Sequence, residues 1–148
     1  MSRKISFRGQ IIDGEIEKIK LSTLNGKTGY KITKFQIIDP SPGQNDVELL
    51  AKIYSKNPST SSVGAGDVDF TEGSLMAVSF YTFKNGDIGV SFQSIFDNEI
   101  TNQDIFITAT DSTAGTKSTN YYIELEAMKL TDIQATQLTL KNIRSITS

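Results

Sequence analysis

The chain of 148 residues carries 15 basic and 17 acidic side chains, giving a formal charge of −2, and 37% of its residues are hydrophobic. It contains no His, Cys or Trp, which excludes Ser–His–Asp and Cys–His hydrolysis, thiol redox chemistry and metal or haem sites built on those side chains. No stretch approaches the roughly 20 apolar residues of a membrane helix, and no apolar run follows the N-terminal basic residues as a signal peptide requires. We therefore expect one domain spanning residues 1–148, with no membrane partner and no specific nucleic-acid binding.

The N-terminal segment alternates apolar and polar residues, which is typical of a strand with one buried face. Ile5 and Phe7 alternate with Lys4 and its polar neighbours. Asp13-Gly14 then predicts a tight turn that can close a hairpin, because Gly accepts positive φ freely.

The next strand changes phase. After the turn signal Asn25-Gly26, Tyr30 and Ile32 point to one face, whereas Phe35 and Ile37 have the opposite parity. Either a β-bulge or a bend from one sheet into another would absorb this slip.

The central part of the chain predicts two more strands and a loop. Residues 47–53 alternate, and Leu75 to Phe83 is apolar on both faces, as in a central strand between two layers. Ser55 to Gly66 is rich in Ser, Gly, Asn and Pro and predicts a long surface loop. We expect this loop and its flank, with Tyr54 and Asn57, either to contact a partner or to remain an exposed loop without one.

Two alternating segments near the C-terminus predict the last strands. They are residues 105–109 and 121–127, separated by a polar loop from Asp111 to Thr119. Adjacent Tyr121 and Tyr122 must face opposite sides of a strand. We expect one of them in the core and the other, Tyr122, on the surface as a candidate partner contact, because Tyr is enriched at interfaces.

The final segment predicts a helix from Asp132 to about Ser145. Thr131 and Gln134 form a capping-box pattern. Ile133, Leu140 and Ile143, with Thr136, fall at helical spacing, and this stripe is expected to pack on the sheet. The Thr content leaves a strand as the alternative.

About eight short strands followed by one helix predict an all-β fold. We expect an antiparallel β-sandwich of the jelly-roll type with a C-terminal helix.

Two acidic segments are candidate sites. Asp67 and Asp69 stand at alternate positions, as oxygen ligands do at the start of a calcium loop. The segment departs from the EF-hand pattern, because its Gly falls seventh as Gly73 and Val78 stands at the twelfth position. Calcium is thus a candidate ligand of Asp67 and Asp69, and no other cofactor is expected. The alternative is a polar turn whose Asp side chains cap local backbone amides.

The second acidic segment runs from Phe96 to Asp104 and contains Asp97, Asn98, Glu99 and Asn102. We consider it a structural turn or a subunit-contact loop, with calcium binding or paired-carboxylate glycoside cleavage as alternatives. The cleavage needs a raised pKa and a sugar cleft, neither of which a sequence displays. We expect no enzymatic activity.

Several stretches carry a resemblance to a known group of proteins. They are Phe7-Arg8-Gly9-Gln10-Ile11, residues 25–32, residues 95–106, residues 120–126 and the helix around residues 138–141. Together they resemble small proteins encoded by marine tailed bacteriophages. The resemblance spans nearly the whole chain and implies a virion component.

The resemblance implies a structural protein of the phage particle, either a capsid decoration or cement protein or a part of the head–tail connector. Its partners would then be other phage structural proteins, above all the major capsid protein or the connector, and it would be a homo-oligomer in a particle assembled in the host cytoplasm. The alternative is a glycan- or receptor-binding β-sandwich module of a phage tail. That alternative predicts exposed Tyr residues lining a groove.

Overall fold

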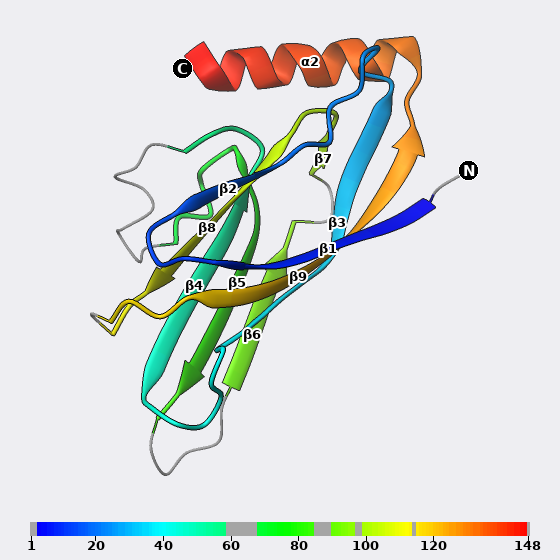
Figure 1. Cartoon of the computed structure of the whole chain (residues 1–148). Helices are drawn as coiled ribbons and strands as arrows, with labels where there is room; N and C mark the ends of the chain where they lie inside the picture. Colours follow the sequence, from blue (N-terminus) through cyan, green and yellow to red (C-terminus); the bar gives the residue numbers. More distant parts are fainter. Residues whose placement is uncertain (1–2, 59–67, 85–89, 97–98, 114, 148) are drawn as a thin grey trace.

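The computed structural model describes residues 3–58, 68–84, 90–96, 99–113 and 115–147. Two antiparallel sheets pack face to face, and one helix lies across an end of the sandwich (Figure 1). The strands are β1 (Arg3–Ile11), β2 (Ile16–Ile19), β3 (Thr28–Ile38), β4 (Val47–Tyr54), β5 (Leu75–Phe83), β6 (Val90–Ile95), β7 (Ile100–Thr101), β8 (Ile105–Asp111) and β9 (Thr119–Lys129). The helix is α2 (Asp132–Thr147). Within the described part of the chain, no helix is both long and apolar enough to cross a membrane.

The strand order confirms the predicted jelly roll. The first sheet, which we call sheet A, has the order β1-β9-β3-β7, and sheet B has the order β2-β8-β4-β5-β6. Four antiparallel pairs are nested in the sequence, the outermost first: β1/β9, β2/β8, β3/β7 and β4/β5. Successive pairs lie alternately in sheet A and sheet B, which is the jelly-roll arrangement. Strand β6 is added at the edge of sheet B, beside β5.

The core is the layer between the sheets, and period-two alternation directs side chains into it. On β9, Tyr121, Ile123, Leu125 and Ala127 are buried, while the residues between them are only partly covered. Ile123 and Leu125 pair with Phe35 and Ile32 of β3, which are buried as well. Burial of these apolar rows is the main stabilising contribution to the fold.

The phase change in β3 is a β-bulge. The register against β9 shifts between Ile32 and Lys34, so that one extra residue on β3 restores inward-facing parity for Phe35.

The prediction of a hairpin at Asp13-Gly14 is wrong in one respect. The turn forms, with Gly14 at φ 80°, but β1 and β2 belong to different sheets. The Gly14 amide instead donates to the carbonyl of Ala109 on β8 at 2.9 Å.

The helix is confirmed, but the face predicted to pack on the sheet is wrong. The capping box forms, since the Gln134 amide donates to the Thr131 hydroxyl oxygen at 3.2 Å and the Thr131 amide donates to the Gln134 side chain at 3.0 Å. However, Ile133 is 71% exposed and Leu140 is 47% exposed, while Ala135 is buried. On the buried side, the Asn102 side chain after β7 donates to the Ala135 carbonyl and the Thr139 hydroxyl, and these hydrogen bonds hold that side of the helix towards the sandwich. The side chain of Ile143 lies outside the described residues.

The core assignment predicts a large difference between two isoleucines. We expect Ile123→Ala, at a fully buried site, to lower the free energy of unfolding by about 2–5 kcal/mol, because it leaves a cavity between the sheets. Ile12→Ala, at a 63% exposed site in the β1–β2 turn, is the matched control and is expected to change it by less than about 0.5 kcal/mol. Urea unfolding of both variants measures this, and equal losses would contradict the assignment.

Candidate functional site

The outward-facing residues of sheet A form cross-strand rows of two kinds. The two rows nearer the helix are largely charged: Lys4–Glu126–Lys31 and Ser6–Glu124–Lys34, each read across β1, β9 and β3. The two rows farther from the helix are Arg8–Tyr122–Gln36 and Gln10–Asn120–Ile38. Sheet A therefore changes from a charged to a mainly amide-bearing surface along the length of its strands.

The amide-bearing rows line a groove of about 830 Å³. Its far wall is Ser91 and Gln93 of β6, from the other sheet. Ser91 pairs with Tyr81 and Gln93 pairs with Ser79 on β5. The two β5 residues are buried, whereas Ser91 and Gln93 are exposed. They are exposed because β7 pairs only with Tyr30 and Lys31 of β3 and leaves this corner of the sandwich uncovered. We call this feature the sheet A groove.

The polar groups of the sheet A groove are mostly neutral. The Gln10 side-chain amide donates to the Asn120 side-chain oxygen at 2.9 Å. The Tyr122 hydroxyl donates to a Glu124 carboxylate oxygen at 3.2 Å, and Lys34 Nζ lies 3.7 Å from the other oxygen. By contrast, no ion pair of Arg8 occurs within the described residues. The lining thus combines four side-chain amides, two tyrosines, two isoleucines and one guanidinium with Ser91 and Gly9.

On the inner side of sheet A, below the groove, Tyr121 spans to the other sheet. Tyr121, next to Tyr122, points inward and its hydroxyl donates to Glu17 of β2 at 2.7 Å. Burial, together with that carboxylate, raises the pKa of Tyr121. Gly9 makes room for this ring, because a Cβ there would lie 2.8 Å from the Tyr121 hydroxyl. The expectation of one core and one surface tyrosine therefore holds, with Tyr122 on the groove side.

Strand β6 is a second candidate surface. Among the residues that the structure describes, it ends sheet B and has no hydrogen-bonded neighbour beyond it. The other sheet-edge strands of the described chain are protected: β1 carries Arg3, Lys4 and Arg8, whereas β2 and β7 are short. Strand β6 has no charged residue and no Pro, the features that usually discourage pairing with another chain.

Exposed aromatic side chains accompany the β6 edge. Phe92 is 62% exposed and pairs with Phe80 on the outer face of sheet B. Phe80 and Phe96 pack against a second buried cluster of Leu50, Tyr54, Leu75 and Val78. Phe70, 59% exposed, meets the Phe96 ring edge-on with centroids 5.1 Å apart. We call Phe70, Phe80, Phe92 and Phe96 the sheet B aromatic band.

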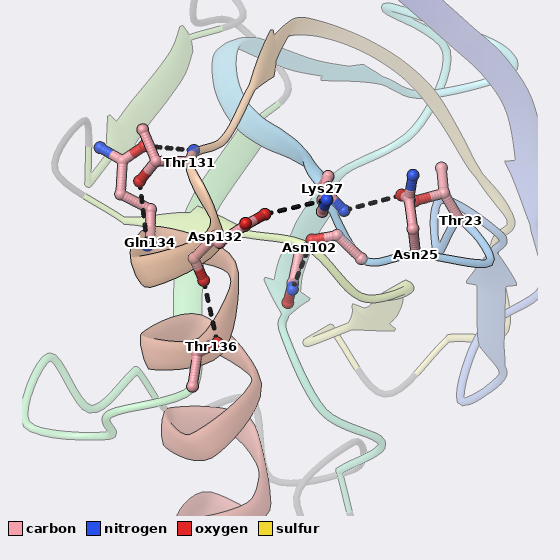
Figure 2. A network of polar contacts seen from close by, with 9 residues as sticks. Thr23, Asn25, Lys27, Asn102, Thr131, Asp132, Gln134 and Thr136 are labelled. Atoms are coloured by element: carbon pink, nitrogen blue, oxygen red, sulfur yellow. Dashed lines mark hydrogen bonds and ion pairs between the residues drawn. The ribbon is translucent and has the colours of Figure 1, made fainter.

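Asn102, predicted as a partner contact, lies inside the protein. It is fully buried, and its side-chain amide donates to the Gly26 carbonyl at 3.0 Å, the Thr139 hydroxyl at 3.1 Å and the Ala135 carbonyl at 3.4 Å. It therefore joins the β2–β3 turn to α2. Lys27 of the same turn adds an ion pair with Asp132 at 2.9 Å (Figure 2). Asn102 thus holds the chain's own helix and presents no exposed surface to a partner.

The remaining described acidic residues near Asn102 also make internal contacts. Glu99 accepts a hydrogen bond from Lys141 Nζ of α2 at 2.7 Å. Asp104 accepts from the backbone amides of Leu21 and Ser22, each at 2.9 Å. Asp97 and Asn98 lie outside the described residues. Where it is described, this segment acts as a structural turn.

Asp104 has a strongly shifted pKa. Burial alone would raise it, but the Ser22 and Leu21 amides and Lys18, whose Nζ lies 3.2 Å away, stabilise the charged form. The net effect lowers the pKa from 3.8 to about 2.

The calcium candidates do not form a cluster in the described chain. Asp69 is exposed and accepts hydrogen bonds from the Thr71 amide at 2.9 Å and the Thr71 hydroxyl. That is the alternative of a capped polar turn, and it lowers the pKa of Asp69. Asp67 lies outside the described residues. No group of three or more potential acidic ligands occurs among the described residues.

The other predicted partner contacts lie at separate places. Tyr54 is only 7% exposed and belongs to the cluster beneath the sheet B aromatic band. Desolvation, with the nearby Glu72 and Asp69 carboxylates, raises its pKa. Asn57 is exposed at the start of the long loop. The structure thus brings neither of them to the sheet A groove, where Tyr122 lies.

Comparison with known proteins adds no family. No family model and no curated protein matches the chain. The crystal structure of Yersinia pseudotuberculosis-derived mitogen (YPM) is similar over 89% of this chain and 89% of that chain, with 11% sequence identity and a TM-score of 0.25. A TM-score this low carries no argument about function.

The position of Asn102 predicts how the helix is attached. We expect Asn102→Ala to remove the shared donor and to lower the free energy of unfolding by about 1–3 kcal/mol, because buried acceptors lose their partner. Amides of α2 should exchange faster while those of β9 stay protected. Leu24→Ala, at a fully exposed position in the adjoining turn, is the control. Unchanged exchange in α2, measured by hydrogen–deuterium exchange, would contradict this role.

The Asp104 pKa predicts a specific acid sensitivity. Because its folded pKa lies below the unfolded value, its contribution to stability is present above about pH 4 and is lost as the pH falls towards 2. The loss is about 2 kcal/mol. Asp104→Asn should flatten the dependence of unfolding free energy on pH in this range. Glu15→Gln, at an exposed turn position, should keep the wild-type slope; equal slopes for wild type and Asp104→Asn would refute the assignment.

Proposed function

We propose that this chain is a structural protein of a bacteriophage particle and acts by protein–protein assembly, as a capsid decoration or cement protein or a component of the head–tail connector. The observation that carries the proposal is the unprotected edge of β6 beside exposed Phe92. The phage source rests on the sequence resemblance alone.

The β6 edge fits this role in two ways. Its unpaired backbone can accept a strand from a neighbouring subunit, which gives hydrogen bonds and fixes register. The sheet B aromatic band beside it supplies apolar area, and exposed aromatic residues are the usual anchors of interfaces. In a particle, symmetry repeats each contact, so individually weak contacts add up to stable attachment.

The test is quantitative mass spectrometry of purified particles of the phage that encodes the chain, counting this protein against the major capsid protein. A ratio matching the capsid symmetry supports decoration, and a low, ring-like ratio supports the connector. Complete absence from the particle would overturn the proposal.

A matched pair of variants tests the surface itself. We expect Phe92→Ser to reduce the copies retained per particle by about tenfold or more, because loss of an aromatic anchor costs roughly 2 kcal/mol of binding. Ile12→Ser, also at an exposed apolar position, lies away from β6 and should leave incorporation unchanged. Equal incorporation of both variants would remove β6 from the interface.

A second candidate function is a glycan-binding module of a phage tail. The sheet A groove favours it, because it is open, lined by amides and includes Tyr122. It uses the outer face of sheet A and the inward side of β6, whereas the sheet B aromatic band faces the opposite way. The two candidates therefore involve different side chains.

A further inference from the structure

We propose that the sheet A groove binds an acidic oligosaccharide, with Arg8 pairing a sugar carboxylate and the surrounding amides bonding to hydroxyl groups. This inference rests on the second candidate function, glycan binding, and is independent of assembly through the sheet B aromatic band.

The side chains of the groove match a hydroxyl-rich ligand. A side-chain amide carries both a donor and an acceptor, and a sugar hydroxyl likewise donates and accepts. Gln36, Gln93 and Asn120 place such amides on three different strands. Gln36 and Gln93 lie on the β3 side of Tyr122, and Asn120 lies two residues away on β9 itself. The Tyr122 ring offers an apolar face to the C–H face of a sugar ring.

The middle of the groove floor has its backbone groups occupied. Strand β9 is hydrogen-bonded to β1 on one side and to β3 on the other. Recognition above β9 therefore comes from side chains. The groove floor crosses β1, β9 and β3, which is two strand spacings or about 10 Å, before it reaches β6 of the other sheet. That length accommodates a short chain of sugar rings.

Arg8 makes the groove selective for negative charge. Its neighbours across the sheet are Tyr122 and, beyond it, Gln36. The nearby Glu124 carboxylate is held by the Tyr122 hydroxyl and Lys34. Within the described residues, no carboxylate forms an ion pair with Arg8. A planar guanidinium in that position is suited to two parallel hydrogen bonds with a carboxylate.

The test measures binding of matched acidic and neutral glycans by isothermal titration calorimetry of the full chain. The probes are tetramers of galacturonate, mannuronate and α2,8-linked sialate, each compared with its fully methyl-esterified, uncharged form. We expect at least one acid to bind at least about tenfold more tightly than its ester, the effect of one charge-assisted contact.

Two charge-removing variants on the same strand locate the contact. Arg8→Gln should abolish the preference for the acid, whereas Lys4→Gln, which removes an equal charge two rows away, should keep it. Both side chains are exposed, so unfolding curves are expected to match the wild type. Tyr122→Ala should weaken binding of acid and ester alike.

The outcomes separate the two levels of the proposal. Equal binding of acid and ester, or an equal effect of Arg8→Gln and Lys4→Gln, would overturn the acidic specificity and leave glycan binding in place. No binding of any probe would overturn both. Incorporation of the protein into particles is measured separately and is unaffected by either result.

Discussion

The pairing of β9 with both β1 and β3 is the constraint on which the rest of the structure depends. It holds three strands in one register, so that every second side chain of each strand enters the core and the others face outwards together. The bulge between Ile32 and Lys34 keeps this true along the whole of β3. The same register that aligns Phe35 with Ile123 in the core aligns Gln36 with Tyr122 outside, so core and groove arise from one interaction.

The two ends of sheet A differ because of what covers them. Near α2, Asn102 occupies the space between the β2–β3 turn and the helix and satisfies acceptors on both. At the opposite end, short β7 leaves the β3 edge open, and β6 forms a wall instead. A buried amide with several partners specifies geometry well, since any displacement leaves polar groups unpaired. The end held by Asn102 is therefore structural, and the open end offers a surface for binding.

The helix illustrates how local pattern and tertiary contact can disagree. The capping box at Thr131 and Gln134 is a local interaction, and it forms as the sequence predicts. The rotation of the helix depends on Asn102, 33 residues before Ala135 in the chain. Helical spacing of Ile133 and Leu140 identified a stripe but contained no information on which side of the helix meets the sandwich. Both side chains are left outside.

Alternation, turn residues and the capping box by themselves determined the all-β sandwich, the two-sided burial of β5 and the start of the helix, because these depend on neighbours in the chain. The change of phase between Tyr30 and Ile37 likewise predicted an irregularity in β3, and the structure shows that it is a bulge. Only the tertiary structure decided that Asp13-Gly14 connects two sheets, that Asn102 lies inside, and that Arg8, Gln36 and Gln93 share one groove. Those positions come together through pairing between strands distant in sequence, and the strand order that does so has no local signature in the residues themselves.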